Sequence, residues 1–220
     1  MSKNVLYLLD NPQCCVFTAF NEDFAKYANS STSNLFAEVD SSIKTCVFMK
    51  QIHSNKVLLV DDIHKQYECD GLLSFDKNIA LCVLSADCLP LVLWHKSGII
   101  AALHSGRKGS FENILKESIL LIQKHKNVDI SEFNLFIGPA ICAKNYEISG
   151  EVLEYARQNF SEFLSENKLD LKALIKFQAK EVGIENIIDS GICTFDDERF
   201  FSYRKDKTKQ RFVTVVYLKA

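Results

Sequence analysis

Three apolar runs between residues 79 and 103 constrain the fold more than any other part of the sequence. They occupy residues 79–84, 91–94 and 99–103. Each has the length and composition of a strand that is buried on both faces. Pro90 follows the first run, and a proline is expected to end that strand's ladder or to place it at a sheet edge. We therefore expect these runs to form neighbouring strands at the centre of a sheet.

Reactive side chains stand where these predicted strands end. Asp87 and Cys88 lie between the first two runs, and His104 directly follows the third. His53 follows another predicted strand, at residues 45–50. A thiol beside an imidazole suits a cysteine nucleophile with a histidine base. Two histidines and one cysteine alternatively suit zinc, with one coordination position left open as in catalytic zinc sites.

The spacing of these residues leaves both readings open. Cys88 is 35 residues from His53 and 16 from His104, which matches no local zinc motif. A loop histidine and a cysteine that caps a core strand would give the same pattern. Asp87 has three open roles: a carboxylate that orients a ligand histidine, a general base toward a metal-bound water, or a hydrogen-bond acceptor in the turn before Pro90.

The rest of the chain contains more predicted strands than helices. Further strands are expected at residues 5–9, 14–20, 57–60, 72–75, 133–137, 187–188 and 211–217. Helices are expected at residues 35–43, 109–124, 150–160 and 169–182. The helices lie mainly after position 108, without the regular alternation of a doubly wound sheet. We therefore expect an α+β fold, a single domain over residues 1–220 with mixed β-sheets and helices on the outside.

Composition excludes several classes of partner. The formal net charge is −2 and the pI about 6.2, so no global positive field points to nucleic acid. The longest apolar runs fall far short of the ~20 residues that a membrane helix needs. The N-terminal apolar stretch is too short for a signal peptide and ends at an acidic residue. We expect a cytoplasmic protein that acts on a small molecule, with no membrane and no obligate protein partner.

Several cysteines are expected to be buried, and the remaining histidines to be solvated, without a role in the site. The eight cysteines are scattered and include no C-x-x-C pair. Cys15, Cys46 and Cys82 lie in apolar runs, where a reduced thiol behaves as a small hydrophobic side chain. The other histidines stand in charged segments and are expected to be solvated: His64, His95 and His125.

Two basic clusters are candidates for anion binding. Arg107 and Lys108 stand between two glycines directly before a predicted helix, where backbone amides can bind an anion. Arg204 lies in a second cluster with Arg199 and Lys205. A solvated surface would explain such charges equally well. The candidates for phosphate binding are Arg107, Lys108 and Arg204.

Seven short motifs give the sequence a family resemblance. They are Gln51-Ile52-His53, Cys69-Asp70-Gly71, Ala86-Asp87-Cys88-Leu89-Pro90, His104-Ser105-Gly106-Arg107-Lys108-Gly109, Ile137-Gly138-Pro139-Ala140-Ile141, Tyr146-Glu147-Ile148 and Phe201-Ser202-Tyr203-Arg204. In this content and order they resemble the bacterial laccase-domain family, also described as multicopper polyphenol oxidase-like or as purine nucleoside phosphorylases. One departure is that Arg107-Lys108 stand where the family usually has Trp-Arg.

The resemblance implies a layered α+β sandwich and a zinc enzyme that acts on purine nucleosides. It implies the metal ligands His53, Cys88 and His104. The implied reactions are phosphorolysis of adenosine, inosine, guanosine and methylthioadenosine, and hydrolytic deamination of adenosine. His53, Cys88, His104 and Asp87 are then the candidate catalytic residues.

Two other activities are alternatives. A copper-dependent polyphenol oxidoreductase is suggested by the family's name, and Cu²⁺ could occupy a Cys-His-His site. The five histidines include no His-x-His element, however, and the methionines are only Met1 and Met49. The second alternative is a cysteine or zinc hydrolase of amide bonds in cell-wall precursors, with Cys88 as nucleophile and His104 as base. A purely structural zinc site is disfavoured, because three ligands leave it open.

Overall fold

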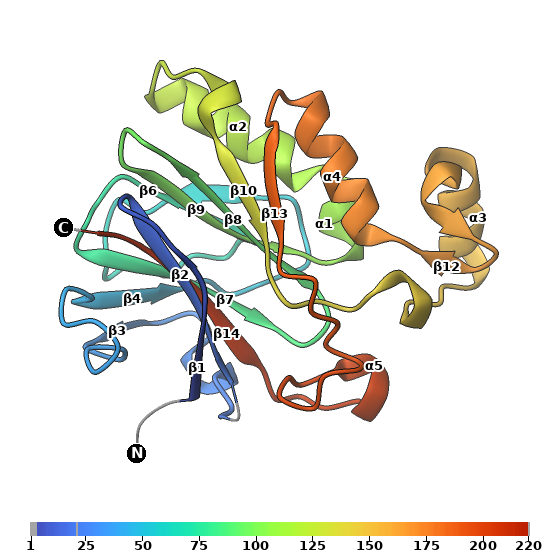
Figure 1. The fold of residues 1–220 in the computed structure, drawn as a ribbon, viewed down its shortest axis with the longest axis horizontal. Helices are drawn as coiled ribbons and strands as arrows, with labels where there is room; N and C mark the ends of the chain where they lie inside the picture. Colours follow the sequence, from blue (N-terminus) through green and yellow to red (C-terminus); the bar gives the residue numbers. More distant parts are fainter. Residues whose placement is uncertain (1–3, 21, 220) are drawn as a thin grey trace.

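The computed structural model describes residues 4–20 and 22–219, and within these ranges two six-stranded sheets form the centre of the molecule (Figure 1). The first sheet has the spatial order β1 (Asn4–Asp10), β2 (Cys14–Phe20), β14 (Phe212–Leu218), β7 (Ile79–Ser85), β4 (Thr45–Phe48) and β3 (Ser31–Ser33). The second has the order β13 (Asn186–Asp189), β10 (Asn134–Ile137), β8 (Leu89–His95), β9 (Ile99–Ser105), β6 (Gly71–Ser74) and β5 (Val57–Leu59). A short hairpin joins β11 (Leu164–Ser165) to β12 (Lys168–Leu169).

Five α-helices lie outside the two sheets in the described part of the chain. They are α1 (Arg107–Phe111), α2 (Ile114–His125), α3 (Gly150–Asn159), α4 (Leu171–Glu181) and α5 (Tyr203–Asp206). Figure 1 shows α2 and α4 together over the second sheet. Both sheets are mixed, because β7 pairs parallel with β4 and antiparallel with β14, while β10 pairs parallel with β13 and antiparallel with β8. The expected α+β fold of mixed sheets with outer helices is confirmed.

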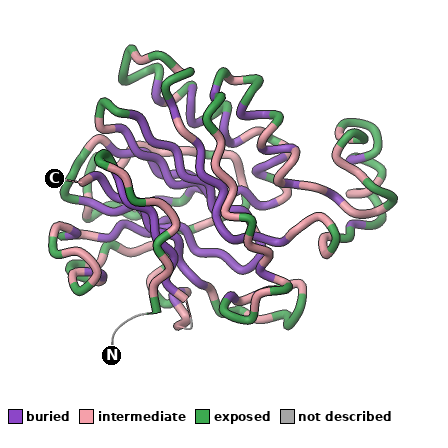
Figure 2. Tube along the Cα trace, in the orientation of Figure 1, coloured by how far each residue is buried: buried purple, intermediate pink, exposed green. Residues whose placement is uncertain are grey.

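Alternating side chains of the central strands build three hydrophobic cores. In β7, Leu81 and Val83 face the second sheet, while Ala80 and Cys82 face the opposite side. This follows from the two-residue period of a strand. The outer face of the first sheet is covered by the segment that carries Phe24, Phe36 and Ile43. The strands of the centre are therefore buried on both faces, as Figure 2 shows in purple.

The second sheet has the helices on its other face. Val92 and Ile100 point into the core that the two sheets share, whereas Leu91 and Leu93 belong to the core under α2 and α4. The order of layers is therefore helices, second sheet, first sheet and the covering segment. This arrangement explains why the three apolar runs between residues 79 and 103 contain almost no polar side chains.

The three apolar runs do not form neighbouring strands of one sheet, because the first is β7 of the first sheet and the other two are β8 and β9 of the second. Two further details differ from the sequence predictions. Residues 35–43 form turns instead of a helix. Asp40 accepts the N–H of Ser42 and the hydroxyl of Tyr217, and such local acceptors compete with helix formation. The helix predicted at 109–124 is split into α1 and α2. At the break, Asn113 adopts a left-handed conformation (φ 56°) and its side chain accepts the N–H of Lys116.

Pro90 also lies elsewhere than expected. The ladder of β7 ends at Ser85, and Pro90 is the second residue of β8. β8 is an interior strand between β10 and β9, so Pro90 does not mark a sheet edge. It is tolerated because the ladder between β8 and β10 begins at Leu91, while the Pro90 carbonyl accepts the N–H of Gly138.

The topology brings several loops to one place. The chain passes from the first sheet to the second between β4 and β5, and again between β7 and β8. β4 and β7 are parallel neighbours, so both connections leave the same edge of the first sheet. β8 pairs antiparallel with β9, which places Leu89, at the start of β8, opposite Ser105, at the end of β9. The two connections and the end of β9 therefore meet.

Candidate metal centre and active site

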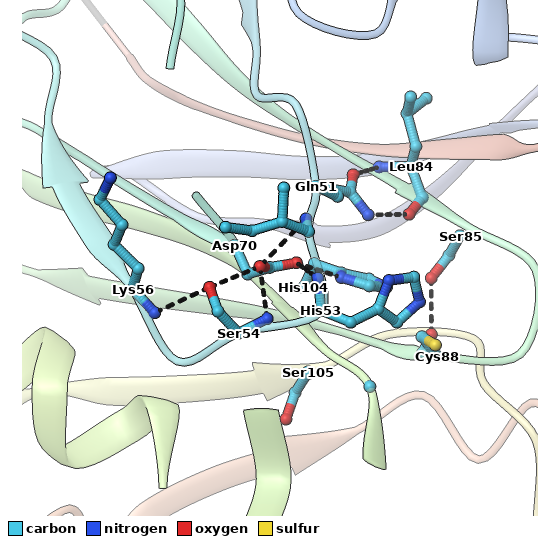
Figure 3. A network of polar contacts seen from close by, with 12 residues as sticks. Gln51, His53, Ser54, Lys56, Asp70, Leu84, Ser85, Cys88, His104 and Ser105 are labelled. Atoms are coloured by element: carbon cyan, nitrogen blue, oxygen red, sulfur yellow. Dashed lines mark hydrogen bonds and ion pairs between the residues drawn. The ribbon is translucent and has the colours of Figure 1, made fainter. Parts of the chain in front are cut away.

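His53, Cys88 and His104 converge at this meeting point (Figure 3). Their ligand atoms all lie within 4.8 Å of one another. His53 comes from the connection after β4, Cys88 from the connection after β7, and His104 from the end of β9. His53 is exposed, Cys88 half-buried and His104 buried, so the group extends from the surface into the interior. The three ligands expected from the sequence are thus brought together.

Asp70, which the sequence analysis did not assign to the site, holds both histidine segments. The Nδ1 atom of His104 lies 2.8 Å from its Oδ1. The N–H groups of Ile52, His53 and Ser54 donate to the same carboxylate at 3.2, 3.0 and 2.6 Å. Burial raises the pKa of Asp70, but the bonds from His104 and Ser54 outweigh it and keep the pKa below its usual value. A proton on Nδ1 leaves Nε2 of His104 free to bind a ligand.

Asp87 is hydrogen-bonded to segments other than those that carry the ligand histidines. Its Oδ1 accepts the Thr194 hydroxyl at 2.7 Å, and its Oδ2 accepts the Arg204 N–H at 2.6 Å. Its backbone carbonyl accepts the N–H of Ile141 at 2.9 Å. These bonds stabilise a left-handed backbone conformation (φ 98°), which is costly for a residue other than glycine. Asp70, and not Asp87, is therefore the carboxylate that orients a histidine of the group.

The thiol and the imidazoles influence one another's ionisation. Burial raises the pKa of the Cys88 thiol, but His104 and His53 lower it by more, to about 6. Burial lowers the pKa of His104, while Cys88 and Asp70 raise it to about 9. Between these values the metal-free pair is a thiolate beside an imidazolium. The thiolate is the form of cysteine that binds metals and attacks electrophiles.

The residues present fit a bound metal ion. Two imidazoles and one thiolate form a donor set that suits zinc and copper. Gly106 leaves the space beside them open, because a Cβ atom there would lie 3.1 Å from Cys88 Sγ and 3.2 Å from His53 Cδ2. The donor set alone does not distinguish the two metals.

A cavity of about 880 Å³ opens over the group, which is the size of a small-molecule site. Its lining includes the three cations singled out from the sequence: Arg107, Lys108 and Arg204. The Arg204 guanidinium lies 5.1 Å from the centre of the Tyr146 ring, and its Nη1 donates to the Glu147 carbonyl. Lys108 is exposed, and Arg107 lies over the ring of Phe111.

The basic residues that line the cavity are not all members of the two basic clusters seen in the sequence. Arg199 pairs with Asp197 at 2.6 Å, and neither Arg199 nor Lys205 is among the residues that line the cavity. The cavity lining instead includes Lys50 and, near the C-terminus, three further cations that the sequence analysis did not single out: Lys207, Lys209 and Arg211. The last three follow α5 on the connection to β14. The position of β14 in the first sheet brings this connection to the cavity, which the local sequence could not indicate.

The expectations for the other cysteines and histidines are mostly confirmed. Cys15, Cys46 and Cys82 are buried in the core. The exposed positions of His64 and His125 agree with the prediction. The prediction for His95 was wrong. It is 2% exposed, because it ends the interior strand β8, and it contacts Ser97 at 2.7 Å and Glu132 at 3.1 Å.

Comparison with known proteins assigns the family. The model of a family described as multi-copper polyphenol oxidoreductase laccase matches residues 18–219. The chain belongs to this laccase family. A purine nucleoside phosphorylase of Campylobacter jejuni is 60% identical over 99% of this chain and 97% of its own length. A purine nucleoside phosphorylase of Clostridium acetobutylicum is 33% identical over 75% of this chain and 73% of its own length.

Solved structures share the fold of this laccase-family protein. A Neisseria meningitidis protein superposes with a TM-score of 0.80 and 21% identity, covering 99% of this chain and all of its own. A hypothetical protein of Bacillus licheniformis gives a TM-score of 0.78 at 22% identity over 97% of this chain and 99% of its own. At such low identity the similarity is one of fold. Within the described residues, no helix has the length and apolar character to cross a bilayer.

Proposed function

We propose that the protein is a zinc-dependent purine nucleoside phosphorylase. The observation that carries the proposal is that His53, Cys88 and His104 stand together in the lining of a cavity that also contains cations and aromatic rings. The name of the Campylobacter relative, at 60% identity over nearly the whole chain, supports the choice of reaction. We propose adenosine, inosine, guanosine and methylthioadenosine as substrates.

In this proposal the three ligands hold one zinc ion, which would supply a Lewis acid with an open coordination position. Asp70 keeps the proton on Nδ1 of His104 and so presents Nε2 to the ion. Arg204 and Arg107 bind phosphate, which attacks C1′ of the ribose as the bond to the purine breaks. Both cations lie against aromatic rings, which limits their motion.

The remaining roles concern the base and its proton. The ring of Tyr146 lines the cavity and offers an apolar face to the purine. Asp87 also lines the cavity, and its carboxylate can accept more bonds than the two that it accepts from the Thr194 hydroxyl and the Arg204 backbone N–H. We assign Asp87 the transfer of a proton to the leaving purine. The open position required for water activation also supports hydrolytic deamination of adenosine as a second reaction of this site.

A cysteine amide hydrolase is the second candidate, because Cys88, His104 and Asp70 form a thiol–imidazole–carboxylate series. Multicopper oxidation has less support. In the described ranges the other histidines form no second metal group, and His95 is engaged by Ser97 and Glu132. Copper bound at the single site remains compatible with the donor set.

The decisive experiment combines metal analysis with a substrate panel. Protein purified without added metal is analysed for zinc and copper, and is then incubated with each nucleoside with and without phosphate. We expect about one zinc per chain and release of free base only with phosphate. No turnover of any nucleoside by the zinc-loaded protein would exclude this function. Stoichiometric copper would instead favour the oxidase.

Alkylation separates the metal enzyme from the cysteine hydrolase. Iodoacetamide should label Cys88 in the metal-free protein, and zinc should prevent the reaction because the sulfur becomes a ligand. Labelling of Cys88 that is unaffected by zinc or by chelators, together with loss of amidase activity, would support the nucleophile.

A further inference from the structure

A second pair of cysteines lies outside the metal centre. Cys142 stands in the segment between β10 and α3, and Cys193 in the connection between β13 and α5. Their sulfur atoms are 2.6 Å apart, although the residues are 51 positions apart in sequence. Both are half-buried and free, and both line a surface depression of about 500 Å³. The proposed reaction at the zinc site uses neither thiol.

Hydrogen-bond donors surround the sulfur of Cys193. Its sulfur accepts the N–H of Cys142 at 3.2 Å. The side-chain amide of Asn145 lies 3.3 Å from the Cys142 sulfur and 3.6 Å from the Cys193 sulfur. Asp196 also lies beside the pair, but Lys144 neutralises it through an ion pair at 2.9 Å.

The distance between the sulfurs favours a covalent bond over a shared metal ion. Two thiolates on one tetrahedral zinc, each at about 2.3 Å, would lie roughly 3.8 Å apart. The sulfurs of a disulfide lie about 2.05 Å apart. The observed separation of 2.6 Å between Cys142 and Cys193 is much closer to the second value. A metal ion could enter only if the two segments moved apart.

We propose that Cys142 and Cys193 form a modification site that reacts with low-molecular-weight disulfides and closes reversibly to an intramolecular disulfide. The Cys193 thiolate attacks one sulfur of the small disulfide, forms a mixed disulfide and releases one thiolate, which takes up a proton. Cys142 then loses its proton and attacks the Cys193 sulfur, which releases the second thiol. Overall, two protein thiols lose two electrons and two protons, and the small disulfide becomes two thiols.

Closure of this disulfide would act on the neighbouring active site. Ile141, which precedes Cys142, donates its N–H to the Asp87 carbonyl, and Thr194, which follows Cys193, donates its hydroxyl to the Asp87 carboxylate. Oxidation therefore joins covalently the two segments that hold Asp87, one residue away from Cys88. It also closes a long loop of chain, which stabilises the folded state.

The test oxidises the zinc-loaded protein, in which Cys88 is protected. Fully reduced protein is treated with glutathione disulfide, free thiols are alkylated, and the peptides are mapped by mass spectrometry. We expect one peptide pair linked through Cys142 and Cys193, restored to free thiols by dithiothreitol, and a rise in Tm of roughly 5–10 °C. The variant Cys142→Ser should instead retain one glutathione on Cys193, because the resolving thiol is missing.

The variant Cys88→Ser, treated without zinc, is the control, because it removes the third half-buried thiol and should leave the Cys142–Cys193 link unchanged. Thiols of this pair that stay free after the treatment would overturn the proposal. So would a link that involves another cysteine. If a second equivalent of zinc protected both thiols in wild type, but left the Cys142 thiol of Cys193→Ser open to alkylation, the pair would be a metal site instead.

Discussion

The Nδ1 atom of His104 lies 2.8 Å from a carboxylate oxygen of Asp70, and the same carboxylate accepts the N–H of His53. One buried side chain therefore sets the orientation of one imidazole and the backbone of the segment that carries the other. The two histidine segments reach the site from separate strands, and Asp70 is hydrogen-bonded to both of them. Its replacement tests whether the metal centre depends on this support.

Asp70→Asn should lower zinc affinity by about 10- to 100-fold, because an amide cannot accept all the hydrogen bonds that the carboxylate accepts. Competition with a chromophoric chelator measures the change. Asp62→Asn is the matched control, because Asp62 is exposed and its carboxylate accepts the nearby N–H of His64. Equal zinc affinity in Asp70→Asn and wild type would contradict a supporting role.

Removal of a proposed ligand should reduce bound metal directly. His53→Ala, Cys88→Ser and His104→Ala each leave two ligands, and we expect zinc content to fall from about one per chain to a small fraction. Elemental analysis after gel filtration measures it. His64→Ala, at an exposed histidine outside the group, should retain full occupancy. If all three ligand variants also kept their zinc, the metal would have to bind elsewhere.

Gly106→Ala tests the space around the ligands. The backbone of Gly106 (φ −74°) is accessible to alanine, so the substitution adds a methyl group without backbone strain. This methyl would lie 3.1 Å from Cys88 Sγ and 3.2 Å from His53 Cδ2 and displace them by a few tenths of an ångström. We expect weaker zinc binding, measured by titration, with a circular dichroism spectrum like that of wild type. Wild-type affinity would show that the ligands tolerate the displacement.

Arg204→Gln should raise the KM for phosphate by roughly 10- to 100-fold, the cost of a lost charge-assisted hydrogen bond. The guanidinium is held in the cavity by its contacts with Tyr146 and the Glu147 carbonyl. Arg199→Gln is a control of equal charge change, at a residue that pairs with Asp197. Initial rates at varied phosphate distinguish the two. A similar rise in both variants would indicate only a loss of general positive charge.

Acid should weaken the contact between α4 and β13. Burial raises the pKa of Asp189, but Lys176, the Gly191 N–H and Lys172 lower it by more, so the folded-state pKa lies below the unfolded one. The stabilisation is complete above the unfolded value of about 3.9 and is lost as pH falls through the folded value. Asp189→Asn should therefore be less stable at pH 7, by about 1 kcal/mol, and lose less stability on acidification.

Urea unfolding at pH 7 and at pH 3 measures both quantities for Asp189→Asn. Asp76→Asn, at an exposed carboxylate between β6 and β7, is the control and should follow the wild-type pH dependence. An identical loss of stability on acidification in Asp189→Asn and wild type would show that this carboxylate does not contribute to the acid sensitivity of the fold.

Local sequence was sufficient for the long buried strands and for singling out the three residues that the fold brings together, but it did not predict the short strands β3, β11 and β12. The apolar runs around Cys88 and His104 are long enough to be assigned as buried strands. Reactive residues directly after such strands stand where the chain leaves the sheet, and they were therefore candidates for a site. Asp70 was missed because an aspartate before a glycine looks like any turn residue. Its partners lie 16 to 34 positions away, and only the pairing of β6 with β9 brings them together.

The partners of Asp87 were beyond prediction for the same reason. Thr194 and Arg204 are 107 and 117 residues away, on a connection whose path depends on the position of β14 between β2 and β7. The short helix expected at residues 35–43 failed for a different reason. Asp40 accepts hydrogen bonds from the Ser42 N–H and the Tyr217 hydroxyl, and these bonds fix the segment as turns against the first sheet.

His53 and Cys88 both lie on connections that cross from one sheet to the other, whereas His104 belongs to the second sheet alone. A metal ion held by all three residues would link both connections to the end of β9 and so cross-link the two sheets. Separation of the sheets would then require release of the metal ion. The free energy of metal binding would then add to the free energy of unfolding. Hydrogen exchange in β4 and β7 would be slower when the site beyond their ends is occupied.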